Sequence, residues 1–211
     1  MPSKSSNSSI EPAGARPSGR RRWSAFFKGT AGLIALGFLA GAISLLVLEE
    51  FDIHTSTTEF CTSCHSTMRD TVYKELQQSK HYTNAAGVRP SCGDCHVAGR
   101  LLHATWEHGL GAGDLFAQLT GDWSDPAKFE EKRPKMAERA RMHLLEEGSE
   151  TCLHCHVMEA IQPQRKRGQR THADAIEKGK TNCIACHYNL VHKEVPLSER
   201  FTQAIKAYGV D

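Results

Sequence analysis

CTSCH at residues 61–65 is the first of four copies of one five-residue motif; CGDCH at 92–96, CLHCH at 152–156 and CIACH at 183–187 follow. Each copy has two cysteines three positions apart and a histidine directly after the second. Two thiols at this spacing on a tight turn can each form a thioether to one haem, and the histidine then faces the iron. The motifs use all eight cysteines: Cys61, Cys64, Cys92, Cys95, Cys152, Cys155, Cys183 and Cys186. The motif-final histidines are His65, His96, His156 and His187.

Paired cysteines also occur in structural zinc sites, disulfide frameworks and thioredoxin-like redox sites. None of these needs a histidine behind every pair, so the sequence favours four covalently bound haem c groups. Four porphyrins are large apolar bodies that can replace much of an aliphatic core. We therefore expect a mainly α fold, a multihaem cytochrome c domain with short helices and loops around four haems. Covalent attachment also suits an extracytoplasmic location.

The formal charge of +2 is unevenly spread. Residues 1–28 carry six basic residues against Glu11 alone, and residues 49–211 carry 20 basic and 23 acidic residues, 20 − 23 = −3. This balance argues against nucleic acid as a partner.

Residues 29–48 contain no charged side chain and follow Arg20-Arg21-Arg22 and Lys28. Twenty helical residues span about 30 Å, enough to cross the hydrocarbon layer of a membrane. A cleaved signal peptide is the alternative, but Ala40-Gly41-Ala42 would place its cleavage site in the middle of the apolar run. We expect an uncleaved signal anchor crossing the inner membrane once, with a cytoplasmic N-terminus and a periplasmic haem domain. Gly37 and Gly41 form a G-x-x-x-G pair. Ordinary use of small residues in a membrane helix explains this pair, and the alternative is a close helix–helix contact in a homo-oligomer.

The predicted organisation is a tail at 1–28, a transmembrane helix at 29–48, a tetrahaem domain at 49–195 and a polar, peripheral tail at 196–211. Only twelve residues separate Leu48 from Cys61, so the first haem should lie close to the membrane surface.

Three helical segments are expected between the motifs. The first covers residues 68–81, and the second follows His96 and is interrupted by Gly109, Gly111 and Gly113. The third begins at Asp125-Pro126, is kinked at Pro134 and stops at Gly148. The basic run at 165–170 is interpreted as a solvated loop, or alternatively as a docking patch for an acidic redox partner.

Six-coordinate haem needs a second axial ligand, and eight histidines lie outside the motif-final positions. They are His54, His81, His103, His108, His143, His154, His172 and His192. Four irons can use only some of them, so others must have different roles.

Several stretches together resemble the NapC/NirT family of membrane-anchored tetrahaem cytochromes c, over about residues 20–195. They are FCTSCH at 60–65, GVR at 87–89, CGDCHV at 92–97, PAKFEEKR at 126–133 with AER at 137–139, and Cys186-His187 followed by His192. The resemblance implies a quinol dehydrogenase that feeds periplasmic reductases.

By the same resemblance, His81, His172 and His192 match the distal haem ligands of the family. Gly99 stands where some relatives have a fourth distal histidine, and His103 is the substitute candidate. Met68 is an alternative ligand of the first haem, although it lies one residue further from the motif than in relatives. His54, His143 and His154 are assigned to surface or propionate contacts.

The resemblance also points to a quinone site. Asp114 matches an acidic residue that relatives place near the first haem and the quinol, and His108 replaces a lysine. Quinol oxidation releases protons, so an acceptor with a tunable pKa is chemically useful there. Packing against haem is the alternative role for both residues.

Three functions remain open for a haem protein of this design. The first is quinol oxidation with transfer to a periplasmic reductase, of the nitrate or nitrite type. The second is the reverse flow, in which a periplasmic oxidation of a nitrogen compound such as hydroxylamine reduces the quinone pool. The third is a passive electron-carrier module with no quinone site, which uses the apolar helix only as a tether. The expected redox partner is a periplasmic enzyme or cytochrome.

Overall fold

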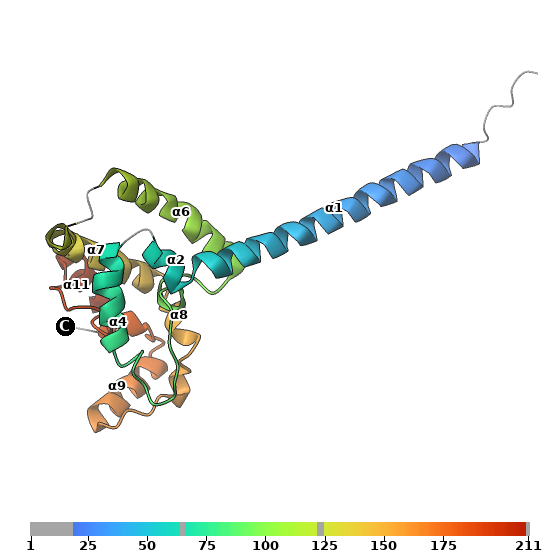
Figure 1. The fold of residues 1–211 in the computed structure, drawn as a ribbon. Helices are drawn as coiled ribbons and strands as arrows, with labels where there is room; N and C mark the ends of the chain where they lie inside the picture. Colours follow the sequence, from blue (N-terminus) through green and yellow to red (C-terminus); the bar gives the residue numbers. More distant parts are fainter. Residues whose placement is uncertain (1–18, 64–65, 122–124, 210–211) are drawn as a thin grey trace, which may run out of the picture. The chain divides into compact units, whose positions relative to one another are not determined.

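The computed structural model describes residues 19–63, 66–121 and 125–209, and every regular element in these ranges is a helix (Figure 1). The chain divides into two compact units, Met1–Val47 and Leu48–Asp211. The mainly α fold predicted from the sequence is confirmed for the described residues.

The first helix, α1, runs from Gly19 to Thr55, and its part from Lys28 to Thr55 is long and apolar enough to cross a membrane. Its large apolar side chains, such as Leu33, Phe38 and Leu46, are exposed. The predicted apolar helix is therefore confirmed, and it is longer at both ends than residues 29–48.

The second unit is built from short helices and two long ones. The long helices are α6 (Leu101–Thr120) and α7 (Pro126–Glu146). The short α-helices are α2 (Thr58–Ser63), α3 (Ser66–Met68), α4 (Lys74–Gln78), α5 (Gly93–His96), α8 (Glu150–Leu153), α9 (Lys166–Glu177), α10 (Cys183–Cys186) and α11 (Glu199–Ile205). A π-helical turn, η1 (Arg69–Tyr73), and two 3-10 turns, η2 (Met158–Ala160) and η3 (Lys206–Tyr208), complete it.

The small apolar core lies where α7, α10 and α11 meet. It consists of Leu145, Ile184, Ala185, Phe201 and Ile205. Phe201 is fully buried, and Ser198 caps its helix by accepting a hydrogen bond from the Phe201 N–H. The prediction of a peripheral tail after Pro196 was therefore wrong, because two apolar residues four apart in a polar segment close this core.

Ser149 and Asn182 join the core to the third and fourth motifs. Ser149 adopts a left-handed backbone conformation, with φ of 60°, directly before α8. Its hydroxyl donates to Asn182 Oδ1 at 2.6 Å and accepts from the Ile184 N–H at 3.0 Å. The Asn182 amide in turn donates to the Leu145 carbonyl at 2.7 Å. This buried network ties α7, α8 and α10 together.

Local signals predicted some helix boundaries and missed others. The Asp125 side chain accepts from the Ala127 N–H at 2.9 Å, so the predicted start of α7 is confirmed, and Pro134 lies inside a continuous helix. The segment predicted at 68–81 is helical but ends at Gln78. The glycines at 109, 111 and 113 do not interrupt α6, which was predicted to be broken there. The basic run at 165–170 is not a loop, since α9 begins at Lys166.

Candidate haem-binding site

Each described haem motif folds as a single helical turn. Motifs two and four form α5 and α10, and motif three begins within α8. In all three, the N–H of the final histidine donates to the carbonyl of the first cysteine, at 2.8–3.0 Å. This turn places the two cysteines, three positions apart, on one side. In the first motif, Cys61 belongs to α2, whereas Cys64 and His65 lie outside the described residues.

Successive motifs contact one another along the chain. The Cys61 thiol donates a hydrogen bond to the Cys92 thiol, which lowers the pKa of Cys92 to about 6. Motifs two and three meet where Thr151 Oγ1 donates to the Cys95 carbonyl at 3.1 Å. A hydrogen bond from Cys152 lowers the pKa of Cys183 to about 6 in the same way, joining motifs three and four. Groups attached at neighbouring motifs would therefore be close together.

A close backbone approach fixes the second motif against the segment before the first. A Cβ on Gly93 would overlap the carbonyl of Ser56, so only glycine fits there. The Cys92 N–H also donates to Thr58 Oγ1 at 3.2 Å.

Three motif histidines each face one of the predicted distal histidines. The ring centroids of His81 and His156 are 6.2 Å apart, and those of His96 and His192 are also 6.2 Å apart. His172 on α9 lies 6.1 Å from His187 by the same measure. The chain thus brings together three pairs of imidazoles from distant segments.

The spacing of these pairs fits an iron ion between two imidazoles. A metal–nitrogen bond of about 2.0 Å plus about 1.1 Å from that nitrogen to the ring centre gives about 3.1 Å on each side of the metal. Two imidazoles on one metal therefore have ring centres about 6.2 Å apart. Burial, followed by the nearby His156, lowers the pKa of His81. A neutral imidazole keeps the lone pair that a metal needs. The donor set therefore fits haem.

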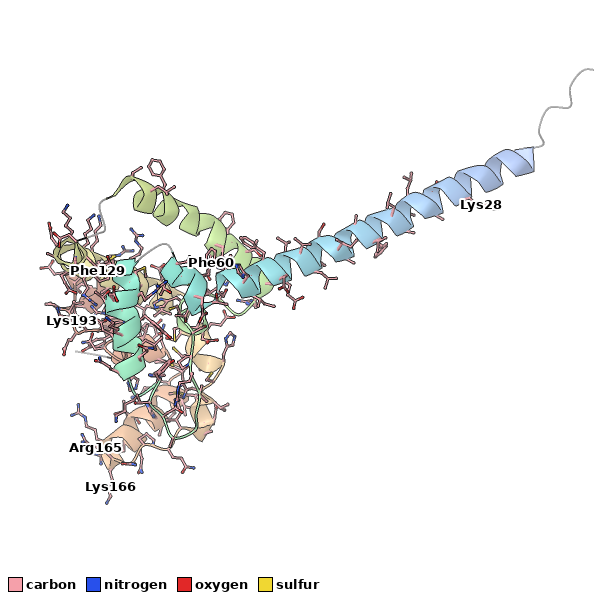
Figure 2. All side chains as sticks on the ribbon, viewed as in Figure 1. Lys28, Phe60, Phe129, Arg165, Lys166 and Lys193 are labelled. Carbon is pink, nitrogen blue, oxygen red and sulfur yellow. The ribbon has the colours of Figure 1, made fainter. Side chains whose placement is uncertain are left out.

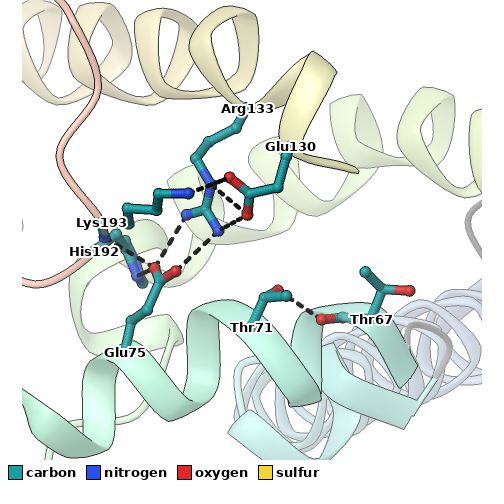
Figure 3. Close-up of polar contacts among 7 residues, drawn as sticks. All are labelled: Thr67, Thr71, Glu75, Glu130, Arg133, His192 and Lys193. Atoms are coloured by element: carbon teal, nitrogen blue, oxygen red, sulfur yellow. Dashed lines mark hydrogen bonds and ion pairs between the residues drawn. The ribbon is translucent and has the colours of Figure 1, made fainter. Parts of the chain in front are cut away.

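An ion-pair network contacts His192 through its Nδ1 atom (Figure 3). His192 Nδ1 lies 3.5 Å from Glu75 Oε2, and the Lys193 N–H donates to the same oxygen at 3.0 Å. Arg133 donates to both oxygens of Glu75, at 2.8 and 3.1 Å, and to Glu130 at 2.6 Å. Lys193 Nζ completes the network, 2.8 Å from Glu130. A carboxylate behind a ligating imidazole orients the ring and makes it a stronger donor.

Arg141 holds the loop that carries His192. Its buried guanidinium donates to Asn189 Oδ1 at 2.7 Å, to the Val195 carbonyl at 3.2 Å and to the Pro196 carbonyl at 3.4 Å. The ends of this loop are thus anchored to α7.

His108, one of the two predicted quinone-site residues, contacts a residue that the sequence did not single out. Its Nδ1 lies 3.2 Å from Asp52 Oδ1 and 2.9 Å from the Ala104 carbonyl. The two side chains are only 18% and 22% exposed, and Phe51 packs edge-on against the His108 ring. Asp114 belongs to α6, but its side chain lies outside the described set.

The other predicted residues occupy different surroundings. His103 Nε2 lies 3.5 Å from Glu147 and 3.9 Å from Glu107, rather than facing a described motif histidine. Its ligand role stays a prediction, as does that of Met68 at the end of α3.

Three further histidines have contacts of other kinds. His143 Nε2 lies 2.8 Å from Glu107, and His54 packs edge-on against Phe60. The His154 ring occupies the space that a Cβ on Gly99 would need. A larger residue at position 99 would therefore require the exposed His154 side chain to move.

Two residues of the site, Asp52 and Glu75, were missed in the sequence. Asp52 follows the apolar run directly and could have been noticed as an acid at the membrane boundary. Glu75 carries no local signal, since its importance comes from His192 and Arg133, which lie far along the chain.

Four attachment motifs in the sequence, contacts between successive motifs, paired histidines and an apolar N-terminal helix define an electron-transfer cytochrome of the multihaem c type. The family described as "NapC/NirT cytochrome c family, N-terminal region" matches residues 24–197, and the chain belongs to that family. Its members are membrane-anchored and shuttle electrons between the quinone pool and periplasmic reductases.

Several relatives support this assignment. A "Probable tetraheme cytochrome c-type" protein of Nitrosomonas europaea is 40% identical over 176 residues, covering 82% of this chain and 73% of the relative. NirT of Stutzerimonas stutzeri is 33% identical, over 67% of this chain and 71% of the relative. TorC of Escherichia coli is 38% identical over 67% of this chain, but the match spans only 37% of TorC. No solved structure matches the chain.

Proposed function

We propose that this protein oxidises quinol at the membrane surface and passes the electrons to a soluble periplasmic redox enzyme or cytochrome. The observation that carries the proposal is the His108–Asp52 contact. Asp52 lies four residues beyond Leu48, where the apolar run of α1 ends. A proton acceptor is thereby available where quinol headgroups lie.

Eight cysteines would attach four haem c groups, which when bound supply acceptors that each take one electron. His96 with His192, His156 with His81, and His187 with His172 would provide axial ligands for three of them. The first haem would use His65 or Met68. The contacts between successive motifs support an electron path in chain order, since electron transfer requires closely spaced centres.

His108 is suited to accept a proton from quinol. Each quinol that becomes quinone releases two electrons and two protons. The Ala104 carbonyl and Asp52 both face His108 Nδ1, so the proton of the neutral ring resides there. Nε2 then carries the lone pair, and Asp52 stabilises the imidazolium that forms. Asp114 would be a second acceptor on the same helix.

A basic surface on α9 is suited to electron exit. His172, the proposed partner of the last motif histidine, belongs to this helix. Arg165, Lys166, Arg167 and Arg170 are exposed at its N-terminal end, and Figure 2 labels the first two. A positive patch steers an acidic partner and raises its association rate. We infer an acidic periplasmic redox protein as the electron acceptor.

The positive N-terminal segment supports a cytoplasmic N-terminus and a periplasmic haem domain. The same parts would also serve the reverse flow, from a periplasmic oxidation into the quinone pool. A redox titration separates the two directions, since haem potentials well above that of the pool argue against quinone reduction.

The test is anaerobic reduction of the full-length protein in proteoliposomes by a quinol analogue, followed at the haem absorption bands. We expect rapid reduction of the wild type. The rate of reduction of His108→Ala should be at least about tenfold lower, since a positioned general base contributes about 10²–10⁴-fold to a rate. Asp52→Asn should give a smaller loss, because the carboxylate acts through His108.

His54→Ala is the matched control, because His54 is the other non-motif histidine near the end of α1. Dithionite should reduce all variants equally. Absence of quinol-dependent reduction in the wild type would remove the proposal, and unchanged rates in His108→Ala would favour a carrier without a quinone site.

A further inference from the structure

Helix α6 turns its polar side toward the protein. Ala104 is fully buried on this side, and Glu107 Oε2 accepts a hydrogen bond from the Ala98 N–H at 2.7 Å. Its other oxygen lies 2.8 Å from His143 on α7. The contacts that hold α6 in place are therefore made largely by histidines and carboxylates.

The opposite side of α6 is apolar and exposed. Four large side chains on it are each 64–74% exposed: Leu102, Trp106, Leu110 and Phe116. The first three recur every four residues, and at about 100° per residue Phe116 falls within the same arc, away from Glu107. The helix contains no lysine or arginine.

This arrangement is the reverse of a helix on a water-facing surface, whose apolar side faces the core. An apolar row of this size in contact with water is unusual for a monomer and marks an interaction surface.

The neighbourhood of α6 identifies the partner. His108, on the same helix, contacts Asp52 just beyond the apolar run of α1. The helix therefore lies close to where the chain leaves the bilayer. Tryptophan is enriched at that level of a membrane, and an apolar helix face without charges is suited to the boundary between headgroups and acyl chains.

We propose that α6 is an interfacial membrane helix, with the face formed by Leu102, Trp106, Leu110 and Phe116 in contact with the phospholipid of the same membrane. The haem domain then has a second membrane contact in addition to α1. This contact holds the domain in one orientation and keeps His108 at the level of the lipid surface. The inference does not depend on quinol oxidation.

The experiment is photolabelling of the full-length haem protein in phospholipid vesicles that contain a diazirine-bearing lipid, with the labelled peptides identified by mass spectrometry. We expect label on α1 and on α6, with the α6 peptide labelled at least about fivefold more than the exposed α7 and α9 peptides. Label confined to α1 would overturn the proposal. Crosslinking of α6 to a second copy in the vesicles, in place of lipid label, would also overturn it.

Paired variants test the apolar face itself. Leu110→Gln should lower the label on α6 several-fold, whereas Leu190→Gln, at an exposed leucine in a loop of the haem domain, should leave it unchanged. Unchanged haem spectra establish that both variants are folded. Equal α6 labelling in the two variants would contradict the proposal, and because no quinol is present, the outcome is independent of the quinol assay.

Discussion

Replacement of Arg133 by methionine should destabilise the haem domain, because two carboxylates would lose the cation that pairs with them. The Arg133 side chain is 6% exposed, and its guanidinium bridges Glu75 and Glu130. Methionine fills much of the same volume, so the main loss is the cation. Glu75, 21% exposed, is then a largely buried charge without its strongest partner.

The size of the stability loss depends on which ion-pair partners Glu75 and Glu130 still have without Arg133. Removal of one partner of a buried ion pair costs about 3–5 kcal/mol. Glu130 is 37% exposed and keeps Lys193 at 2.8 Å, so it is partly compensated. The lower end, about 3 kcal/mol, is therefore expected, and for a domain of this size it corresponds to a fall in Tm of roughly 6–12 °C.

Thermal unfolding of the full-length protein in detergent, followed by far-UV circular dichroism, provides the assay. Lys74→Met is the control, since it breaks an exposed ion pair with Asp70 of 3.1 Å. Such a pair is worth less than about 1 kcal/mol. A double variant, Arg133→Met with Glu75→Gln, should recover part of the loss because the unpaired charge is gone. Equal Tm values for Arg133→Met and Lys74→Met, or no recovery in the double variant, would refute this reasoning.

Two further predictions concern the haem potentials and the joint between motifs. Glu75→Gln weakens the negative charge behind His192, so on the proposed ligation it should favour ferrous iron and raise one haem potential. A tenfold change in the preference of the ligand set for ferric over ferrous iron shifts the potential by about 59 mV, which an optical redox titration measures. Glu199→Gln on α11 is the control and should leave all haem potentials unchanged. Ser149→Ala leaves the Ile184 N–H and Asn182 Oδ1 unpaired in a buried site, which should cost about 1–3 kcal/mol in thermal unfolding. A Tm within 1 °C of the wild type, which is about the error of the assay, would contradict that account.

Features that depend on contacts between residues close in sequence could be predicted from the sequence. In the three motifs that the structure describes in full, the two cysteines and the histidine share one helical turn, and Asp125 caps the helix that begins with Pro126. The predicted break in α6 failed for a related reason. Each glycine disfavours a helix by only about 1 kcal/mol, and contacts such as His108 with Asp52 can outweigh that cost.

Tertiary packing explains the predictions that failed at the C-terminus and at 165–170. Phe201 and Ile205 are isolated apolar residues in a polar stretch, and only the partner surface on α7 and α10 gives them a place in the core. The basic run forms the first turn of α9, although its charge pattern favoured a loop.

The amino-acid sequence by itself determined the haem motifs, the apolar anchor and the family, because covalent attachment and membrane insertion depend on residue types at short, fixed spacings. Only the tertiary structure decided which histidine faces which motif, that Glu75 and Arg133 stand behind His192, and that Asp52 meets His108. These contacts join residues that are distant along the chain, and they depend on how the helices pack.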